Sequence, residues 1–157
     1  MQRTTTNLLL GAIVSLTIFA GVHAGKGKED AIKLVDKTSA DMEKDAAGTI
    51  KKIVAAEHPY KDKETPSFYV FVYNTDVVIV AHPKKHLVGR SYKGKPDVRG
   101  KKFRDALVST ALKEKTGWVD YSYQKPGATG IHAKTSYCKL VTGSDGKKYI
   151  VCCGIYK

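Results

Sequence analysis

The sequence has few cysteines and none of the arrangements that are typical of a metal site. Its three cysteines, Cys138, Cys152 and Cys153, form no CxxC or CxxCH motif and no cluster with histidine. Structural zinc and covalently attached haem are typically held by such motifs, so we expect no metal and no other cofactor. No pattern pairs a nucleophile with a base and an orienting group, and we therefore do not expect an enzyme.

Acidic residues are scarce in the second half of the chain. Lys and Arg number 27 against 15 Asp and Glu, a net charge of +12. Residues 25–81 are near neutral, whereas residues 82–157 hold seventeen basic and five acidic side chains. Residues 84–104 alone hold nine basic side chains against the single Asp97. Such a concentrated positive field favours an anionic partner, whether metabolite, polyanion or acidic membrane surface.

A single long apolar run occurs, and it lies at the N-terminus. Arg3 precedes the uncharged run 8–20, which leads to Val-His-Ala at 22–24, a small-x-small pattern. Because the run is short and no stop-transfer charges follow at once, we predict a secretory signal peptide over residues 1–24 and a periplasmic or secreted protein. An uncleaved anchor is the alternative. Cleavage leaves 157 − 24 = 133 residues, a single domain over 25–157.

Apolar periodicity predicts an α+β fold. Residues 29–56 carry apolar or small side chains at steps of three and four, which predicts one long helix with Gly48 as a weak point. Residues 68–74 and 77–81 are rich in β-branched and aromatic side chains and predict a hairpin buried on both faces. The elements expected after it are a basic loop over 82–100, a helix over 102–115, and strands over 118–124, 131–141 and 147–156.

Residues 119–139, VDYSYQKPGATGIHAKTSYCK, predict two strands with an unusual set of polar groups. Strand alternation puts Tyr121 and Tyr123 on one face of the first strand. In the second strand Lys134 shares a face with Ser136, and Tyr137 lies on the opposite face. A strand pair lined by tyrosines and one lysine is poorly suited to a hydrophobic core, because a buried ammonium needs an anionic partner. The segment therefore favours a small bound anion.

Six short motifs resemble the extracellular Cache domains of the single-domain, PAS-like type, across residues 29–157. They are FYVFVYNTDVVIVAHP, a Gly-Arg-Ser loop, RGKKF, GWVDYSYQKPG, AKTSY and the terminal CGIYK, in the family's order. The resemblance implies a long N-terminal helix on a five- to six-stranded, mostly antiparallel PAS-like sheet, with a loop-helix insertion over a ligand pocket. Family members are mostly sensor modules of receptors that bind small organic acids, amino acids or related metabolites. Since no second span or signalling domain follows, we expect a free-standing exported form.

The resemblance and the residue pattern together indicate candidate ligand contacts. Lys134 matches the family's lysine that contacts a ligand carboxylate, and tyrosine hydroxyls and a histidine at the end of a buried strand can donate to the same anion. Arginines in the basic loop can grip a carboxylate through two parallel hydrogen bonds. The alternatives are a surface lysine, tyrosines that only pack the sheet, and a histidine that only forms a turn. The predicted contacts are His82, Arg90, Tyr92, Arg99, Tyr121, Tyr123, Lys134 and Tyr69.

The cysteines allow one cross-strand disulfide. A hairpin turning at 143–146 brings Cys138 close to Cys152 or Cys153. We take Cys138 and Cys152 as the candidate pair, and three unbonded buried thiols are the alternative.

We predict a sensor domain for a small organic anion, such as a short-chain or 2-oxo carboxylate. The alternative is an exported basic interaction protein that holds a polyanion or an acidic surface, with binding that weakens steeply with salt. Nucleic acid is not expected, given export and the lack of a reading motif. Further expected partners are a membrane receptor or signalling protein and a second copy bound through the N-terminal helix.

Overall fold

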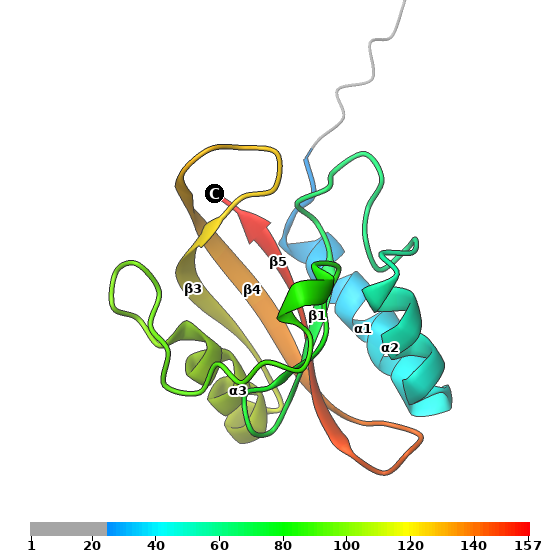
Figure 1. The fold of residues 1–157 in the computed structure, drawn as a ribbon. Coiled ribbons are helices and arrows are strands. Elements are labelled where there is room, and N and C mark those ends of the chain that lie inside the picture. Colours follow the sequence, from blue (N-terminus) through cyan, green and yellow to red (C-terminus); the bar gives the residue numbers. More distant parts are fainter. Residues whose placement is uncertain (1–24) are drawn as a thin grey trace, which may run out of the picture.

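The structure is a computed structural model that describes residues 25–157, so the predicted signal peptide lies outside the described residues. Helices α1 and α2 cover one face of the sheet and α3 covers the other (Figure 1). The strands and the helix α3 follow in the predicted order, and the α+β class is confirmed. Within residues 25–157, no helix is long and apolar enough to cross a membrane. The elements are α1 (Lys28–Lys44), α2 (Ala46–Val54), β1 (Val70–Asn74), β2 (Ile79–Ala81), the short 3₁₀ helix η1 (Lys85–Leu87), α3 (Phe103–Glu114), β3 (Thr116–Gln124), β4 (Ile131–Thr142) and β5 (Lys148–Tyr156).

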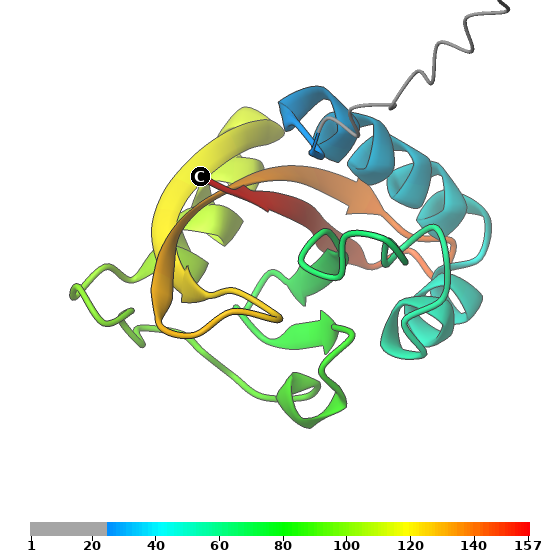
Figure 2. The same ribbon diagram turned by 90° about the horizontal axis from the view of Figure 1, so that it is seen from above.

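The strands form one antiparallel sheet in the order β2-β1-β5-β4-β3. Strands β3 and β4 curve strongly, and the segment between β2 and α3 extends away from them (Figure 2). The five-stranded antiparallel PAS-like sheet confirms the prediction. The first hairpin is shorter than predicted, because Asn74 Oδ1 accepts hydrogen bonds from the backbone N–H groups of Asp76 and Val78 and so extends the turn.

The prediction of one helix over residues 29–56 is wrong, because the helix breaks at Asp45. This residue leaves the helical conformation, at φ −152° and ψ 86°, and its Oδ1 accepts a hydrogen bond from Gly48 N at 2.9 Å. A side chain that accepts from the first turn is a helix N-cap, so Asp45 begins α2. The β4–β5 turn supports the break, since Ala46 N donates to Ser144 Oγ and Ser144 N donates to Met42 O.

The sheet separates two hydrophobic cores. On β1, Val70 and Val72 pack under α1 and α2, whereas Phe71 and Tyr73 face the α3 side. All four side chains are buried, which confirms the prediction that this strand is covered on both faces. Because successive residues of a strand point to opposite faces, the buried apolar residues of the central strands alternate between the two cores. The site described below lies on the α3 side.

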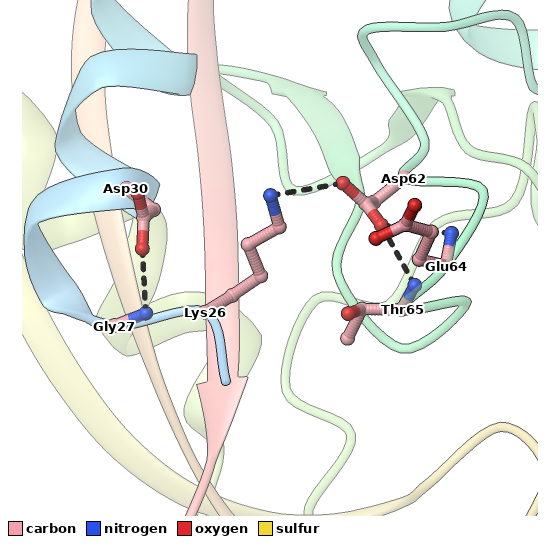
Figure 3. Close-up of polar contacts among 6 residues, drawn as sticks. All are labelled: Lys26, Gly27, Asp30, Asp62, Glu64 and Thr65. Atoms are coloured by element: carbon pink, nitrogen blue, oxygen red, sulfur yellow. Dashed lines mark hydrogen bonds and ion pairs between the residues drawn. The ribbon is translucent and has the colours of Figure 1, made fainter. Parts of the chain in front are cut away.

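The beginning of α1 is tied to a turn that precedes β1 (Figure 3). Gly27 N donates to Asp30 Oδ2 at 2.9 Å, which satisfies one of the free N–H groups of the first turn. Lys26 Nζ lies 3.1 Å from Asp62 Oδ2. The same Asp62 carboxylate accepts from Thr65 N at 2.7 Å. These contacts hold the start of the described chain against the body of the domain.

Candidate functional site

The pairing of β3, β4 and β5 brings tyrosines to both sides of Lys134. Tyr121 pairs with Lys134 across β3 and β4, and Tyr156 pairs with Lys134 across β4 and β5. Directly paired residues point to the same face of a sheet, so the three side chains share the α3 face. Tyr137 lies on the other face, where it packs against Trp118. The alternation inferred from the sequence is therefore confirmed.

Lys134 is a buried cation inside an aromatic cage. Only 1% of its surface is exposed. Its Nζ lies 4.6 Å from the ring centroid of Tyr69, 4.8 Å from that of Tyr156, 5.4 Å from that of Phe71 and 5.7 Å from that of Tyr123. Its hydrogen-bond contact is a long one of 3.4 Å to Tyr69 Oη. The surface role that the sequence left open for this lysine is excluded by its burial.

Among residues 25–157, no Asp or Glu forms an ion pair with Lys134. Within residues 25–157, no Asp or Glu lines the cavity that Lys134 faces. Burial lowers the pKa of the Lys134 ammonium to about 7. The nearby Cys153 thiol opposes this shift, and the positive charge of Lys84 adds to it. Aromatic faces offset only part of the cost of removing an ammonium from water. An anion placed at Nζ would restore the partner that the protein itself does not supply.

The tyrosines that line the cavity carry hydroxyl groups that can donate. Tyr121 Oη and Ser136 Oγ form a hydrogen bond of 2.8 Å, and the Tyr121 ring stacks on Phe103 with centroids 4.2 Å apart. Burial raises the pKa values of Tyr69 and Tyr121 well above the ordinary value, so both phenols stay protonated at neutral pH. A protonated phenol in a dry site can donate to a carboxylate oxygen.

His82 is buried and neutral. Burial, and then the charge of Lys134, lower the pKa of His82 to about 3. Its Nδ1 accepts a hydrogen bond from Lys84 N at 2.8 Å. In a neutral imidazole the other nitrogen then carries the proton, so Nε2 is a donor. His82 lies edge-on to the Tyr69 ring, with centroids 5.2 Å apart, and is suited to donating a hydrogen bond rather than to pairing as a cation.

Arg104 is a second cation at the cavity, and the sequence did not single it out. Its guanidinium carbon lies 4.2 Å from the ring centroids of both Tyr92 and Phe103. It is the second residue of α3, where a positive charge opposes the helix dipole. A basic side chain in such an unfavourable position is a signal that sequence reading could have used. The predicted contact Tyr92 lies against Arg104 and lies outside the cavity lining.

The cavity brings together most of the predicted residues. About 10 Å³ is open to the centre of a water-sized sphere, which is room for about one water molecule. The structure does not bring Arg90 or Arg99 to it. Arg99 instead lines a neighbouring depression, which Tyr121 and Lys134 also border. Phe71 belongs to the core on this face and also borders the cavity. The lining residues are Tyr69, Phe71, Tyr73, Ile79, His82, Phe103, Arg104, Tyr121, Tyr123 and Lys134.

One disulfide lies in the same sheet face. Cys138 and Cys152 are direct partners in the β4–β5 register and are joined by a disulfide. Cys153 points to the opposite face and is a free, buried thiol. Of the two pairings that the sequence allowed, strand alternation permits only this one. Among residues 25–157, no group of three His, Cys, Asp or Glu side chains could hold a metal ion.

A PAS-like sheet that holds a caged cation on its α3 face defines a small-molecule sensory domain. The family model for the Cache domain matches residues 31–157, and the chain therefore belongs to this family as a single Cache domain. Cache domains bind ligands and are not catalytic, which is consistent with the expectation that the chain is not an enzyme. No curated protein matches the chain.

Solved structures share the fold. A periplasmic sensor domain of a chemotaxis protein is 25% identical, with a TM-score of 0.60 over 82% of this chain and 88% of that one. A Cache chemosensory domain described for carboxylic acid recognition is 23% identical, with a TM-score of 0.64 over 82% and 91%. A methyl-accepting chemotaxis protein from Vibrio parahaemolyticus is 15% identical, with a TM-score of 0.64 over 82% and 87%.

Proposed function

We propose that this Cache domain is exported and binds a small carboxylate beside Lys134. The observation that carries the proposal is a fully buried ammonium in a cavity that no Asp or Glu lines within residues 25–157. A carboxylate at Nζ would pair the charge, while Tyr69, Tyr121 and His82 supply donors to its oxygens. The similar chemosensory domain described for carboxylic acid recognition supports the same ligand class.

The cavity chemistry also predicts which small acids are rejected. Its polar side chains are cations, phenols and one neutral imidazole that donates. An amino acid brings an ammonium group that would need an acceptor of opposite charge, and the lining offers none among residues 25–157. Short-chain and 2-oxo acids lack that group and fit the site. Because the open space is about 10 Å³, the lining side chains must move apart even for a ligand of a few heavy atoms.

The biological setting is part of the same proposal. A signal peptide over residues 1–24 would carry the domain to the periplasm or outside the cell, and the similar periplasmic sensor domain supports that location. We propose that a membrane receptor or signalling protein reads the bound state. In this scheme the domain captures the acid, and another chain transmits the signal.

The test is thermal stabilisation of residues 25–157 by four three-carbon probes at constant ionic strength: propionate, pyruvate, L-alanine and propionamide. We expect the two acids without an amino group to raise the melting temperature, with about 2.7 kcal/mol of stabilisation at a hundredfold excess over Kd. Alanine and propionamide should leave the melting temperature unchanged. A response to alanine or propionamide equal to that to propionate would overturn the proposed chemistry.

A matched pair of variants assigns the response to the cage. Lys134→Met removes the buried charge, and Lys139→Met removes a charge from the same strand where it is half-buried and pairs with Asp36. We expect binding to be lost in Lys134→Met and kept in Lys139→Met. Equal carboxylate affinity in Lys134→Met and the wild type would exclude Lys134 as the anchor.

A second candidate function rests on the loop over residues 93–102. Asp97 is the acid of this loop, and its carboxylate accepts from the N–H groups of Arg99, Lys101 and Ser122. These hydrogen bonds hold its carboxylate against backbone N–H groups, while the side chains of Lys93 and Lys95 are exposed. This arrangement suits contact with a polyanion or an acidic surface. The salt-dependent test of this candidate is given in the Discussion.

A further inference from the structure

The Lys134 side chain lies across strand β5 to reach its cage. Lys134 belongs to β4, whereas Phe71 belongs to β1 and Tyr69 directly precedes β1. In the sheet, β5 lies between β4 and β1. The ammonium therefore contacts rings that stand two strands away from its own backbone, at 4.6 Å from the Tyr69 centroid and 5.4 Å from that of Phe71. A side chain can take this path only if β5 leaves room beneath it.

Gly154 is the residue of β5 that leaves this room. It pairs with Ser136, which lies two residues after Lys134 on the same face of β4. A Cβ atom at position 154 would lie 2.5 Å from Lys134 Cε and closer still to Ser136 Oγ. Carbon atoms normally approach each other to about 3.5–4.0 Å. The lysine stem therefore occupies the space that any other residue at position 154 would need.

The backbone itself does not require a glycine here. Within residues 25–157, Gly154 is not among the glycines with positive φ, so an alanine could adopt its conformation. Glycine in a strand interior weakens the strand, because it gains no packing and loses more conformational freedom on folding. The close approach of Lys134 and Ser136 is the feature that accounts for a glycine in this strand.

We propose that Gly154 is a positioning residue of the ligand site, whose missing side chain lets Lys134 cross β5 and present its ammonium inside the aromatic cage. The proposal rests on the proposed function only for what the ammonium binds. The position of the lysine can be measured without any ligand, so the two ideas can fail separately.

Gly154→Ala tests the inference with the fold kept intact. The new methyl group overlaps the far ends of two flexible side chains, Lys134 and Ser136, and its nearest backbone atom is Thr135 O at 3.0 Å. Both side chains can swing away, and the backbone needs to shift by only a few tenths of an ångström. We therefore expect a folded variant whose ammonium is displaced from the cage.

The readout is the titration of the Lys134 Cε resonances by NMR in protein labelled with ¹³C-lysine, assigned by their loss in Lys134→Met. Burial holds the pKa of Lys134 at about 7 in the wild type. In Gly154→Ala we expect this pKa to rise by more than one pH unit as the ammonium moves toward water, and propionate affinity to fall at least tenfold. An unchanged titration in a folded Gly154→Ala variant would overturn the proposal.

Two further variants distinguish a specific effect on the position of Lys134 from a general loss of packing in the sheet. Ser136→Ala with Gly154→Ala removes the hydroxyl overlap and leaves the lysine overlap, so the raised pKa should persist. Gly117→Ala changes another glycine of the sheet, whose Cβ would meet the Thr110 side chain instead of Lys134. It should leave the Lys134 titration where it is in the wild type. Equal shifts of the Lys134 pKa in Gly117→Ala and Gly154→Ala would show a general loss of packing in the sheet and would overturn the inference.

Carboxylate binding and the lysine titration are measured independently and can give different outcomes. If no carboxylate stabilises the wild type, the proposed function fails, and the lysine titration still decides the role of Gly154. If carboxylates bind but Gly154→Ala moves neither the titration nor the affinity, the proposed function stands and the positioning role is excluded.

Discussion

Buried Lys134 gives the stability of the domain a specific dependence on pH. Its pKa is about 7 in the folded protein and about 10.5 when the side chain meets water, so the unfolded chain binds this proton more tightly. Stability therefore rises with pH between about 7 and 10.5, and below pH 7 the full cost of the charged form is present.

The variant Lys134→Met removes this dependence. Relative to Lys134→Met, the ligand-free wild type should gain roughly 2 kcal/mol in its free energy of unfolding between pH 7 and pH 9. Urea denaturation of both proteins at several pH values measures the difference, and the other titrating groups cancel in it. Parallel pH profiles would mean that Lys134 is not held at a lowered pKa.

Ligand binding at the same residue should take up a proton. A carboxylate at Nζ favours the charged form and raises the pKa of Lys134 from its value of about 7. At pH 8 most of the free protein carries a neutral Lys134, so binding of propionate should draw nearly one proton from the buffer. Calorimetric titrations in phosphate and in Tris check this, because the two buffers differ in ionisation enthalpy. Equal binding enthalpies in both would contradict it.

Among the elements, the junction of α1 and α2 depends on one side chain. Asp45 Oδ1 caps α2 by accepting from Gly48 N, and Asp45→Ala should lower the free energy of unfolding by about 1 kcal/mol. Asp45→Asn keeps an oxygen acceptor and should recover most of the loss. Glu43→Ala, an exposed change on α1, is the control. Urea denaturation measures all three, and a loss in Asp45→Asn equal to that in Asp45→Ala would point to charge instead of capping.

On the scale of the whole molecule, positive charge gathers on the segment between β2 and α3. The triple variant Lys93→Gln, Lys95→Gln, Lys102→Gln removes three exposed charges there, and Lys44→Gln, Lys51→Gln, Lys52→Gln removes the same number from the helical side. If the second candidate function holds, heparin binding should fall more in the first triple and weaken steeply with salt. Equal losses in the two triples, or an affinity insensitive to salt, would exclude this loop as a polyanion site.

The predicted homodimer through the N-terminal helix stays a prediction. Among residues 25–157, the exposed large hydrophobic residues are Val98, Leu112 and Ile131, and none of these belongs to α1. Pairing through α1 would therefore depend on its charged surface. Sedimentation of the purified domain at low and high salt would test it.

Parts of the site could be predicted because they follow from local rules. Alternation along a strand put Lys134 and Tyr121 on defined faces, and the same rule selects Cys152 over Cys153 as the partner of Cys138. Arg104 was missed because its place at the cavity depends on how α3 packs on the sheet. Arg90 and Arg99 were chosen for their chemistry, and the course of the loop leaves them outside the cavity lining.

Local patterns were enough to predict the α+β class, the order of the strands and of the helix over 102–115, and the alternation of faces along 118–124 and 131–141. Hydrophobic periodicity and β-propensity act over a few neighbouring residues, which is why these features could be read from the chain. Long-range packing determines that Lys134 is buried, that its stem passes over Gly154, and that His82 and Arg104 line the same cavity from separate segments. Those features depend on strand register and on packing between residues far apart in the chain. The helix break at Asp45 also depends on long-range packing, since the β4–β5 turn that supports it lies about a hundred residues away.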